Sequence, residues 1–407
     1  MEISVTRTFT KDDGCWRVLR GGSRHFTHRL VFDPPTYSCT CKEYERTKPR
    51  LCRHLYGLKF YLRDRGELPK KGRQSPAKET PYRDWPSIYK GMGEKYGEIK
   101  RFLFELCRPL QGHMPSELGG RPRVPLSDLV YATVLKVRMQ EAQRNMKSVL
   151  RDEKEAGRLT VVPTGSCIGR FFWSPEAEPT IRVLLDQTLV PLAGMDTTFA
   201  VDSTALPIPR RELWFDSKAG EPRERMQTMK AHGCCGINTH IIAGVQVTQG
   251  DRNLGKAKKT GDSRQFPFLL SETCKRFRVL EVLGDNAYCS NKNYRIASDA
   301  GIRLTSYCKK SDEGLQGGPF RLAVLFQRFH PREHQRLYGR RSHIESVNSV
   351  IKRLFPGKLF CKEIQSLRIE ILCMILIHNL GCLVRAKHEW GKEIEFWKGD
   401  DEEDETV

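Results

Sequence analysis

The chain has 407 residues, of which 69 are Lys or Arg and 49 are Asp or Glu, so its formal net charge is +20 at pH 7. Hydrophobic residues make up 39% of the chain, which is too many for a disordered protein and too few for an integral membrane protein. An excess of positive charge this large indicates a polyanionic partner, with nucleic acid favoured over an acidic membrane surface.

The cellular compartment can be predicted from the presence or absence of secretory and membrane-spanning segments and from the use of cysteine. The N-terminal residues Met1 to Arg7 lack the apolar core of a secretory signal. The most apolar stretch, Ile371 to Val384, is interrupted by polar residues and a glycine, which predicts a buried core helix instead of a membrane span. In a chain of this size, 14 cysteines favour reduced thiols or metal ligands over disulfides. We therefore expect a cytoplasmic, nucleoid-associated protein with no membrane partner.

Residues 1–65 form the first predicted domain, because the following stretch, residues 66–90, is rich in proline and basic residues and typical of an extended linker. Within this domain, Trp16–Leu19 and Thr27–Phe32 are predicted strands, and Leu55, Leu58 and Leu62 have helical spacing. The domain is therefore expected to be a small α+β module.

The same module contains a candidate metal site. Cys39 and Cys41 are followed by Cys52 and His54, and three thiolates with one imidazole can close a tetrahedral zinc site. The alternative is a set of buried thiols without a metal. The order Cys-x-Cys then Cys-x-His, behind two strands, resembles the SWIM-type zinc finger. That resemblance implies a structural Zn²⁺ and a module that binds either nucleic acid or protein.

Residues 91–192 show mostly helical periodicity. Apolar residues recur at helix spacing from Tyr96 to Leu103, and a further helix is expected after a cap at Ser127. Shorter helices are predicted at Ser166–Phe172 and Thr180–Leu189. The basic character of this block predicts a helical middle domain that binds DNA, while a packing domain with a solvated basic face is an equal alternative.

From Thr197 onwards the pattern is that of an α/β domain. Short apolar or β-branched runs predict strands, and a helix is expected from a cap at Ser290 to Gly301. A helix of this length between two strands predicts a βαβ unit. The predicted strands are Phe199–Asp202, His240–Val247, Arg278–Leu283 and Ile302–Tyr307.

Two aspartates lie at the ends of predicted strands. Asp202 ends the first run and is followed by Ser203 and Thr204, while Asp285 directly follows a later strand. A carboxylate at a strand end is held rigidly and remains accessible, which suits catalysis. Taken alone, however, each of these aspartates is more typical of a turn or a cap.

A helix near the C-terminus carries the most specific pattern. Its apolar residues, from Ile344 to Leu354, form one stripe that is expected to face the core. Arg341, Glu345 and Lys352 are spaced by four and seven residues, so they share a second stripe. A carboxylate between two cations stays ionised, and the cations can bind phosphates. An amphipathic helix with ordinary salt bridges is the alternative.

These residues match a known motif. Tyr338, Arg341, Glu345 and Lys352 have the spacing Tyr-x2-Arg-x3-Glu-x6-Lys, which resembles the signature of a large group of insertion-sequence transposases of the DDE class. The resemblance covers residues 193–385 and implies an RNase H-like catalytic domain, in which a mixed five-stranded sheet is flanked by helices. Residues 386–407 would then be an acidic tail.

The resemblance also assigns roles to individual residues. Asp202, Asp285 and Glu345 would be the three catalytic acids, converging closely enough to hold two ions of Mg²⁺ or Mn²⁺. Tyr338, Arg341 and Lys352 would contact the end of the mobile element. The implied activity is metal-dependent cleavage at element ends followed by strand transfer into target DNA, by in-line phosphodiester displacement.

The implied partners are double-stranded DNA, both element ends and target, and further copies of the chain in the active complex. A different hypothesis is a catalytically silent or repurposed transposase-derived protein that binds DNA through its zinc finger and basic surface. A third is another RNase H-like nuclease, such as a junction resolvase. Loss of one acid would favour the second hypothesis, and absence of strand transfer would favour the third.

Overall fold

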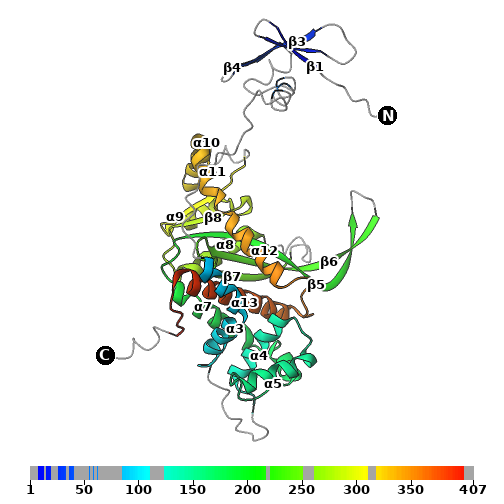
Figure 1. Ribbon diagram of the computed structural model, residues 1–407, viewed down its shortest axis with the longest axis vertical. Coiled ribbons are helices and arrows are strands. Elements are labelled where there is room, and N and C mark those ends of the chain that lie inside the picture. Colours follow the sequence, from blue (N-terminus) through cyan, green and yellow to red (C-terminus); the bar gives the residue numbers. More distant parts are fainter. Residues whose placement is uncertain are drawn as a thin grey trace, which may run out of the picture. The chain divides into compact units, whose positions relative to one another are not determined.

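The computed structural model describes residues 8–12, 15–19, 26–33, 36–40, 55, 58, 62, 85–110, 123–216, 221–250, 261–309 and 318–397. Of these, it describes the backbone alone for residues 8–12, 15–19, 26–33, 36–38, 85–89, 210–216 and 221–226. The chain divides into two compact units, Met1–Arg83 and Asp84–Val407 (Figure 1).

The first unit contains a four-stranded antiparallel sheet in the order β1-β2-β3-β4. Two of these strands, β2 and β3, confirm the predicted strands. Leu55, Leu58 and Leu62 are helical and buried, as their spacing predicts. Cys39 ends the last strand and is buried, while Cys41, Cys52 and His54 lie outside the described residues, so the zinc site stays a prediction. The strands are β1 (Thr8–Asp12), β2 (Cys15–Leu19), β3 (Phe26–Asp33) and β4 (Thr36–Cys39).

The second unit begins with a group of helices. The predicted cap at Ser127 is wrong: the helix begins at Leu126 behind Pro125, and no side chain caps it. Thr164 caps the following short helix by accepting a hydrogen bond from the Cys167 backbone N–H. The helices are α3 (Trp85–Cys107), α4 (Leu126–Met139), α5 (Met146–Glu155), α6 (Gly165–Phe171) and α7 (Ala177–Gln187), with short 3₁₀ turns η1 (Gln143–Asn145) and η2 (Val190–Leu192).

A mixed five-stranded sheet follows, in the order β7-β6-β5-β8-β9. Strand β6 pairs antiparallel with β5 and with β7, whereas β8 and β9 run parallel to β5. This order confirms the mixed sheet expected of an RNase H-like fold. The strands are β5 (Thr198–Asp216), β6 (Glu221–Gly236), β7 (Ile242–Gln249), β8 (Glu281–Gly284) and β9 (Arg303–Ser306).

Strands β5 and β6 extend well past the other three strands (Figure 1). Their pairing continues to Asp216 and Glu221, while β8 pairs only with residues Thr198 to Val201 of β5. The register shifts between Pro207 and Arg211, where a proline cannot donate to the ladder. The predicted strand at Phe199–Asp202 is therefore only the start of a long ribbon, and β6 is a strand that the sequence pattern did not predict.

Helices flank the sheet on both faces. Successive residues of a strand point to opposite faces; Asp202 of β5 contacts Asn348 of α12, and Ser203 contacts Asp262 of α8. The predicted cap at Ser290 is confirmed, because its side chain accepts from the Asn293 N–H. The helices are α8 (Asp262–Cys274), α9 (Asn291–Asp299), α10 (Pro319–Phe329), α11 (Pro331–Gly339), α12 (Ser342–Leu354) and α13 (Ile364–Trp390), with one 3₁₀ turn, η5 (Asn286–Tyr288).

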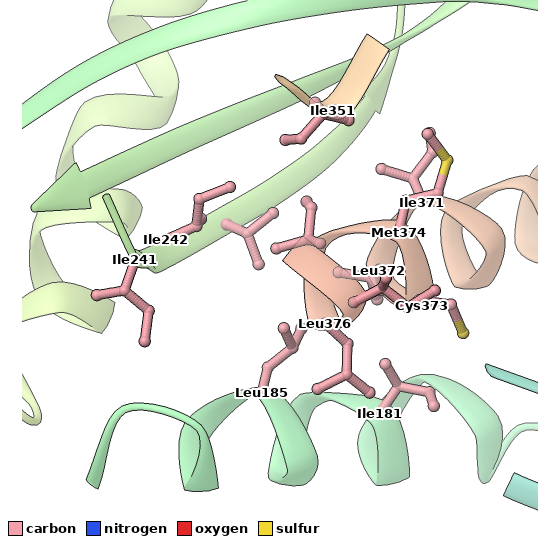
Figure 2. Close-up of a cluster of buried hydrophobic side chains, with 14 of the residues drawn as sticks. Ile181, Leu185, Ile241, Ile242, Ile351, Ile371, Leu372, Cys373, Met374 and Leu376 are labelled. Atoms are coloured by element: carbon pink, nitrogen blue, oxygen red, sulfur yellow. The ribbon is translucent and has the colours of Figure 1, made fainter. Parts of the chain in front are cut away.

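Helix α13 lies in the hydrophobic core of the second unit, where it packs against α3, α7 and β7. Figure 2 shows its side chains, including Leu372 and Leu376, between Ile242 of the sheet and Ile181 of α7. Among the described residues, α13 is the one helix long and apolar enough to span a membrane, and 89% of its most apolar window is buried within the protein. It is the predicted core helix.

A buried amide fixes α13 to the sheet. The Asn379 side chain accepts from the Ile242 N–H at 3.0 Å and donates to the Ile242 carbonyl at 3.0 Å, so it extends the hydrogen-bonding pattern of β7. It also donates to the Thr188 hydroxyl. The helices of residues 85–192 and the sheet thus belong to one compact unit, within which the domain boundaries inferred from the sequence stay predictions.

Candidate active site

Asp202 and Asp285 lie side by side, each directly after the last paired residue of two adjacent parallel strands. Val201 of β5 is paired with Gly284 of β8, so the next residue on each strand is one of the two aspartates. A Cβ atom on Gly284 would come within 3.2 Å of Val201 Cγ2 and 3.1 Å of Tyr288 Cβ. The glycine therefore lets the two strand ends approach closely.

Asp202 is partly buried and has a specific partner on α12. The Asn348 amide donates to Asp202 Oδ2 at 3.1 Å. Burial raises the pKa of the Asp202 carboxyl, and the negative charges of Asp285 and Glu345 raise it further, against the opposing effects of the Ser203 backbone N–H and Arg341. The Asp202 carboxylate is thus partly withdrawn from solvent and lies near two further carboxylates and one guanidinium.

Asp285 is held by its own turn. It precedes η5, and its Oδ1 accepts from the Ala287 N–H at 2.9 Å. Capping of this turn fixes the Asp285 carboxylate beside the sheet. The hydrogen bond uses Oδ1, so Oδ2 could bind a cation. Tyr288 in the same turn is buried, and its hydroxyl has no hydrogen-bond partner among the described residues.

Glu345 lies in the first turn of α12. Ile344, Val347 and Ile351 are buried and hold this helix against β5 and β6, which confirms the predicted apolar stripe. Glu345 forms an ion pair with Arg341, and its side chain is 53% exposed. The predicted carboxylate therefore faces solvent and is paired with the predicted cation on its N-terminal side.

The three predicted acids lie in one region of the protein but are not in mutual contact. Asp285 and Glu345 are both near enough to raise the pKa of Asp202. Within the residues that the structure describes, however, the three do not form a set of ligand atoms all within 4.8 Å of one another. Such a set is formed instead by Glu94, Glu98 and His388, in which Glu98 is ion-paired with Lys387.

The three predicted DNA-contacting residues follow one another along α11 and α12. Tyr338 of α11 is stacked on His334, with ring centroids 5.8 Å apart and planes at 11°. The Arg341 guanidinium lies over the Tyr338 ring at 5.6 Å. Lys352 is exposed on α12. The ring of Tyr338 is thus engaged within the protein, which leaves its hydroxyl as the group suited to an external partner.

An ion pair to a buried carboxylate fixes the connection between α11 and α12. Glu281 of β8 is 3% exposed and pairs with Arg340, which lies between Tyr338 and Arg341. It also accepts from Arg303 at 3.0 Å and from the Thr305 hydroxyl at 3.2 Å. The residues of the motif are therefore tied to the same strand that carries Asp285. The sequence pattern did not indicate this pair.

A second carboxylate, Asp262, lies on the opposite face of β5 and was also missed from the sequence. It accepts from the Ser203 hydroxyl at 3.0 Å and from Lys230 at 2.6 Å, with His232 Nδ1 at 3.3 Å. Burial raises its pKa, but hydrogen bonds from His232, Lys230 and Ser203 outweigh burial and hold the pKa well below its usual range. Lys230 balances its charge, and through the Ser203 hydroxyl it holds β5 next to Asp202.

The comparison with known families agrees with this geometry. Residues 193–380 match the family model of the transposase DDE domain. The match lies within the second unit and covers a little under half of the chain. The matched residues include Asp202, Asp285 and Glu345, and they begin and end close to the boundaries expected from the motif. The sequence is thus similar to the transposase domain that its motif resembles, while the SWIM-type finger and the residue roles stay predictions.

Single proteins and structures resemble the chain only weakly. No curated protein matches its sequence. A piggyBac transposase synaptic complex with hairpin DNA has a TM-score of 0.33 and 10% identity, and the match covers 74% of each chain. A Drosophila P element transposase strand transfer complex has a TM-score of 0.24 and 15% identity, covering 46% of this chain and 38% of that one. The fold of residues 193–380 is therefore described by its sheet order alone.

Proposed function

We propose that this chain is a DNA transposase of an insertion sequence, which cleaves element ends and joins them to target DNA by in-line phosphodiester displacement. The observation that carries the proposal is the register of the parallel strands, which sets Asp202 beside Asp285 while α12 presents Glu345 nearby. A match to the DDE domain over these residues supports it.

The three carboxylates fit Mg²⁺ or Mn²⁺. Their donor atoms are all hard oxygens, and the pKa of Asp202 is raised chiefly by burial and further by the charges of Asp285 and Glu345. Asp202, Asp285 and Glu345 would hold the ions. When bound, two such ions supply activation of the attacking water or 3′-hydroxyl and stabilisation of the leaving oxygen.

The chain's own residues orient this site and bind the substrate. Asn348 donates to one oxygen of Asp202 and so restricts the orientation of this carboxylate. Arg341 pairs with Glu345 in the structure, and a phosphate would be a competing partner for the same guanidinium. Lys352 adds an exposed positive charge further along α12, and the Tyr338 hydroxyl can donate to a phosphate oxygen. These groups would position the element end.

A second candidate function is favoured by one observation. The three carboxylates are not all within 4.8 Å of one another, and Glu345 is tied to Arg341. A catalytically silent, transposase-derived protein that binds DNA would have the same features. In the active protein, by contrast, binding of DNA and cations would draw Glu345 away from Arg341 and towards the aspartates.

The reaction can be tested with the purified full-length chain. DNA carrying the sequences that flank the coding region would be incubated with Mg²⁺, with Ca²⁺ or with EDTA, together with a target plasmid. A transposase yields cuts at the element ends and joined products only in Mg²⁺ or Mn²⁺. Cleavage without joining would favour a nuclease such as a resolvase, and DNA binding without either reaction would favour the silent protein.

The remaining assignments extend the proposal to other parts of the chain. Cys39, Cys41, Cys52 and His54 would hold a structural Zn²⁺, and metal analysis of the purified protein should find one zinc per chain. The active complex would contain double-stranded DNA and more than one copy of the chain, in the nucleoid. Light scattering of the chain with and without element-end DNA measures the number of copies.

A further inference from the structure

Two thiols are in contact near the candidate active site. The Sγ atoms of Cys289 and Cys308 are 3.3 Å apart, and both cysteines are thiols in the structure. They are 19 positions apart in the sequence. A disulfide bond is about 2.05 Å long, so an approach of little more than about 1 Å would join the two sulfur atoms. The pair is therefore close to the separation at which a disulfide forms.

The two cysteines follow neighbouring parallel strands. Cys289 ends the η5 turn behind β8, and Cys308 lies just after the end of β9, which pairs with β8. Next to them, the Asn286 side-chain amide donates to the Tyr307 carbonyl at 2.6 Å. A direct hydrogen bond thus joins the two segments beside the sulfur atoms, so the thiols are held near each other independently of their own contact.

The backbone of each cysteine is also fixed by hydrogen bonds. The Cys308 N–H donates to Gln327 Oε1 at 2.8 Å, and the Cys308 carbonyl accepts from Gln327 Nε2 at 3.0 Å. The Cys289 N–H donates to the Asn286 carbonyl at 3.2 Å and closes the turn. The Tyr294 hydroxyl lies 3.8 Å from the Cys308 sulfur. Because both segments are already ordered, little further conformational entropy is lost when the two sulfur atoms are joined.

The two thiols differ in exposure. Cys289 is half-buried, whereas Cys308 is 4% exposed. A thiol that reacts with oxidants is one that solvent can reach, and it is often placed next to a second, resolving thiol. A small oxidant would therefore meet Cys289 first, with Cys308 already in position to react in the next step.

We propose that Cys289 and Cys308 are a redox modification site, which a hydroperoxide converts to a reversible disulfide. The Cys289 thiolate attacks one oxygen of hydrogen peroxide, so that an S–O bond forms, the O–O bond breaks and one water leaves. Cys308 then attacks the Cys289 sulfur, which forms the S–S bond, breaks the S–O bond and releases the second water. Two electrons pass from the two thiols to the peroxide, and a dithiol reductant reverses the change.

The disulfide would act on the turn that holds Asp285. Asp285 is the N-cap of η5, and Cys289 is the residue that ends the same turn. A bond to Cys308 would fasten this turn covalently to the end of β9. Formation of this bond does not depend on the DNA-cleaving function proposed above.

Peptide mapping of the full-length wild-type chain tests this proposal. Hydrogen peroxide is added stepwise up to a large molar excess, remaining thiols are blocked with N-ethylmaleimide, and the chain is cut with trypsin. Cys289 then lies in the peptide of residues 279–292 and Cys308 in that of residues 304–309. Mass spectrometry should find these two peptides linked, and dithiothreitol should separate them.

Variants then test the order of the two steps. Cys308→Ser removes the resolving thiol, so the sulfenic acid on Cys289 should persist and react with dimedone at least about tenfold more than in the wild type. Cys167→Ser is the matched control, because Cys167 is also half-buried but its sulfur contacts Thr164 and Arg170. This control should leave the yield of linked peptides unchanged. Thermal unfolding identifies a variant that fails to fold, and the wild-type mapping needs no variant.

Three outcomes would overturn the proposal. In the wild type, Cys289 could keep its reactivity with N-ethylmaleimide throughout the peroxide series, or it could be oxidised to sulfinic acid while Cys308 is still alkylated. In folded Cys308→Ser, dimedone labelling of Cys289 could equal that of the wild type. Each of these results would show that Cys308 does not resolve an oxidised Cys289.

Discussion

Val201 and Gly284 are paired in register on two adjacent parallel strands, and this single pairing sets Asp202 beside Asp285. The two aspartates are 83 positions apart in a chain whose intervening segment forms a hairpin, a third strand and a helix. Their meeting therefore depends on the sheet, and any change that displaces the end of β8 should impair the candidate active site.

Gly284→Ala tests this dependence. The added Cβ would lie 3.1 Å from Tyr288 Cβ and 3.2 Å from Val201 Cγ2, so the strand ends must separate slightly. We expect a loss of about 1–3 kcal/mol in the free energy of unfolding, together with reduced DNA cleavage. Urea unfolding and a cleavage assay measure the two effects. Gly93→Ala is the control, because nothing lies within 4 Å of its added Cβ and alanine favours the helix.

Asn348→Ala should lower activity with little change in stability. The substitution removes the hydrogen bond to Asp202 Oδ2, so the carboxylate loses its fixed orientation. Cleavage should fall by about tenfold or more, corresponding to the loss of roughly 1.4 kcal/mol of transition-state stabilisation. Ser349→Ala, at an exposed neighbouring position, is the control. Equal cleavage rates for the two variants would remove Asn348 from the site.

Asp262 should make folding stability depend on pH. Its pKa is held below the usual 3.8 in the folded protein, chiefly by His232 and Lys230 in opposition to burial. A depressed pKa stabilises the fold above the unfolded value, and this stabilisation is lost as the pH falls through the folded value. Asp262→Asn should cost about 1–3 kcal/mol at pH 7 and progressively less below about pH 4. Urea unfolding of both proteins at a series of pH values measures the difference, and a constant difference would contradict the assignment.

Lys352→Ala should weaken binding to element-end DNA and change its salt dependence. If the exposed ammonium contacts one phosphate, the slope of log affinity against log salt should become shallower by about 0.9. Fluorescence anisotropy at several salt concentrations provides the slope. Lys292→Ala, which removes an exposed lysine from α9, should leave it unchanged. A slope unaltered in Lys352→Ala would exclude this phosphate contact.

Local patterns predicted those parts of the fold that depend on local physics. The cap at Ser290, the strand before Asp285 and the apolar stripe of α12 all follow from spacing and side-chain type. Strand β6 could not be found in this way, because Glu221 to Gly236 has no apolar run and pairs with β5 in a ribbon that extends beyond the sheet. Its stability comes from a partner strand, which no local window contains.

The same limit applies to the candidate active site: residues on one helix stripe can be predicted from spacing, whereas contacts between strands cannot. Asn348 lies on the same helical stripe as Arg341, Glu345 and Lys352, so its position could have been predicted from the sequence. Its neutral amide, however, gives no charge pattern that would indicate a role in the site. Asp262 was not, because its partners Ser203, Lys230 and His232 come from other strands. Among the described residues the three acids are near one another but not all within 4.8 Å, and Glu345 is ion-paired with Arg341.

The most direct test of the catalytic assignment compares single-strand cleavage of element-end DNA by Asp202→Asn, Asp285→Asn and Glu345→Gln at equal DNA occupancy in Mg²⁺. Asp299→Asn, at an exposed position of α9, serves as the matched control. The proposed site predicts that the control cleaves at the wild-type rate, whereas each of the three variants binds DNA and fails to cut it. Wild-type cleavage by any one of the three would contradict the assignment of that residue and of the shared metal site.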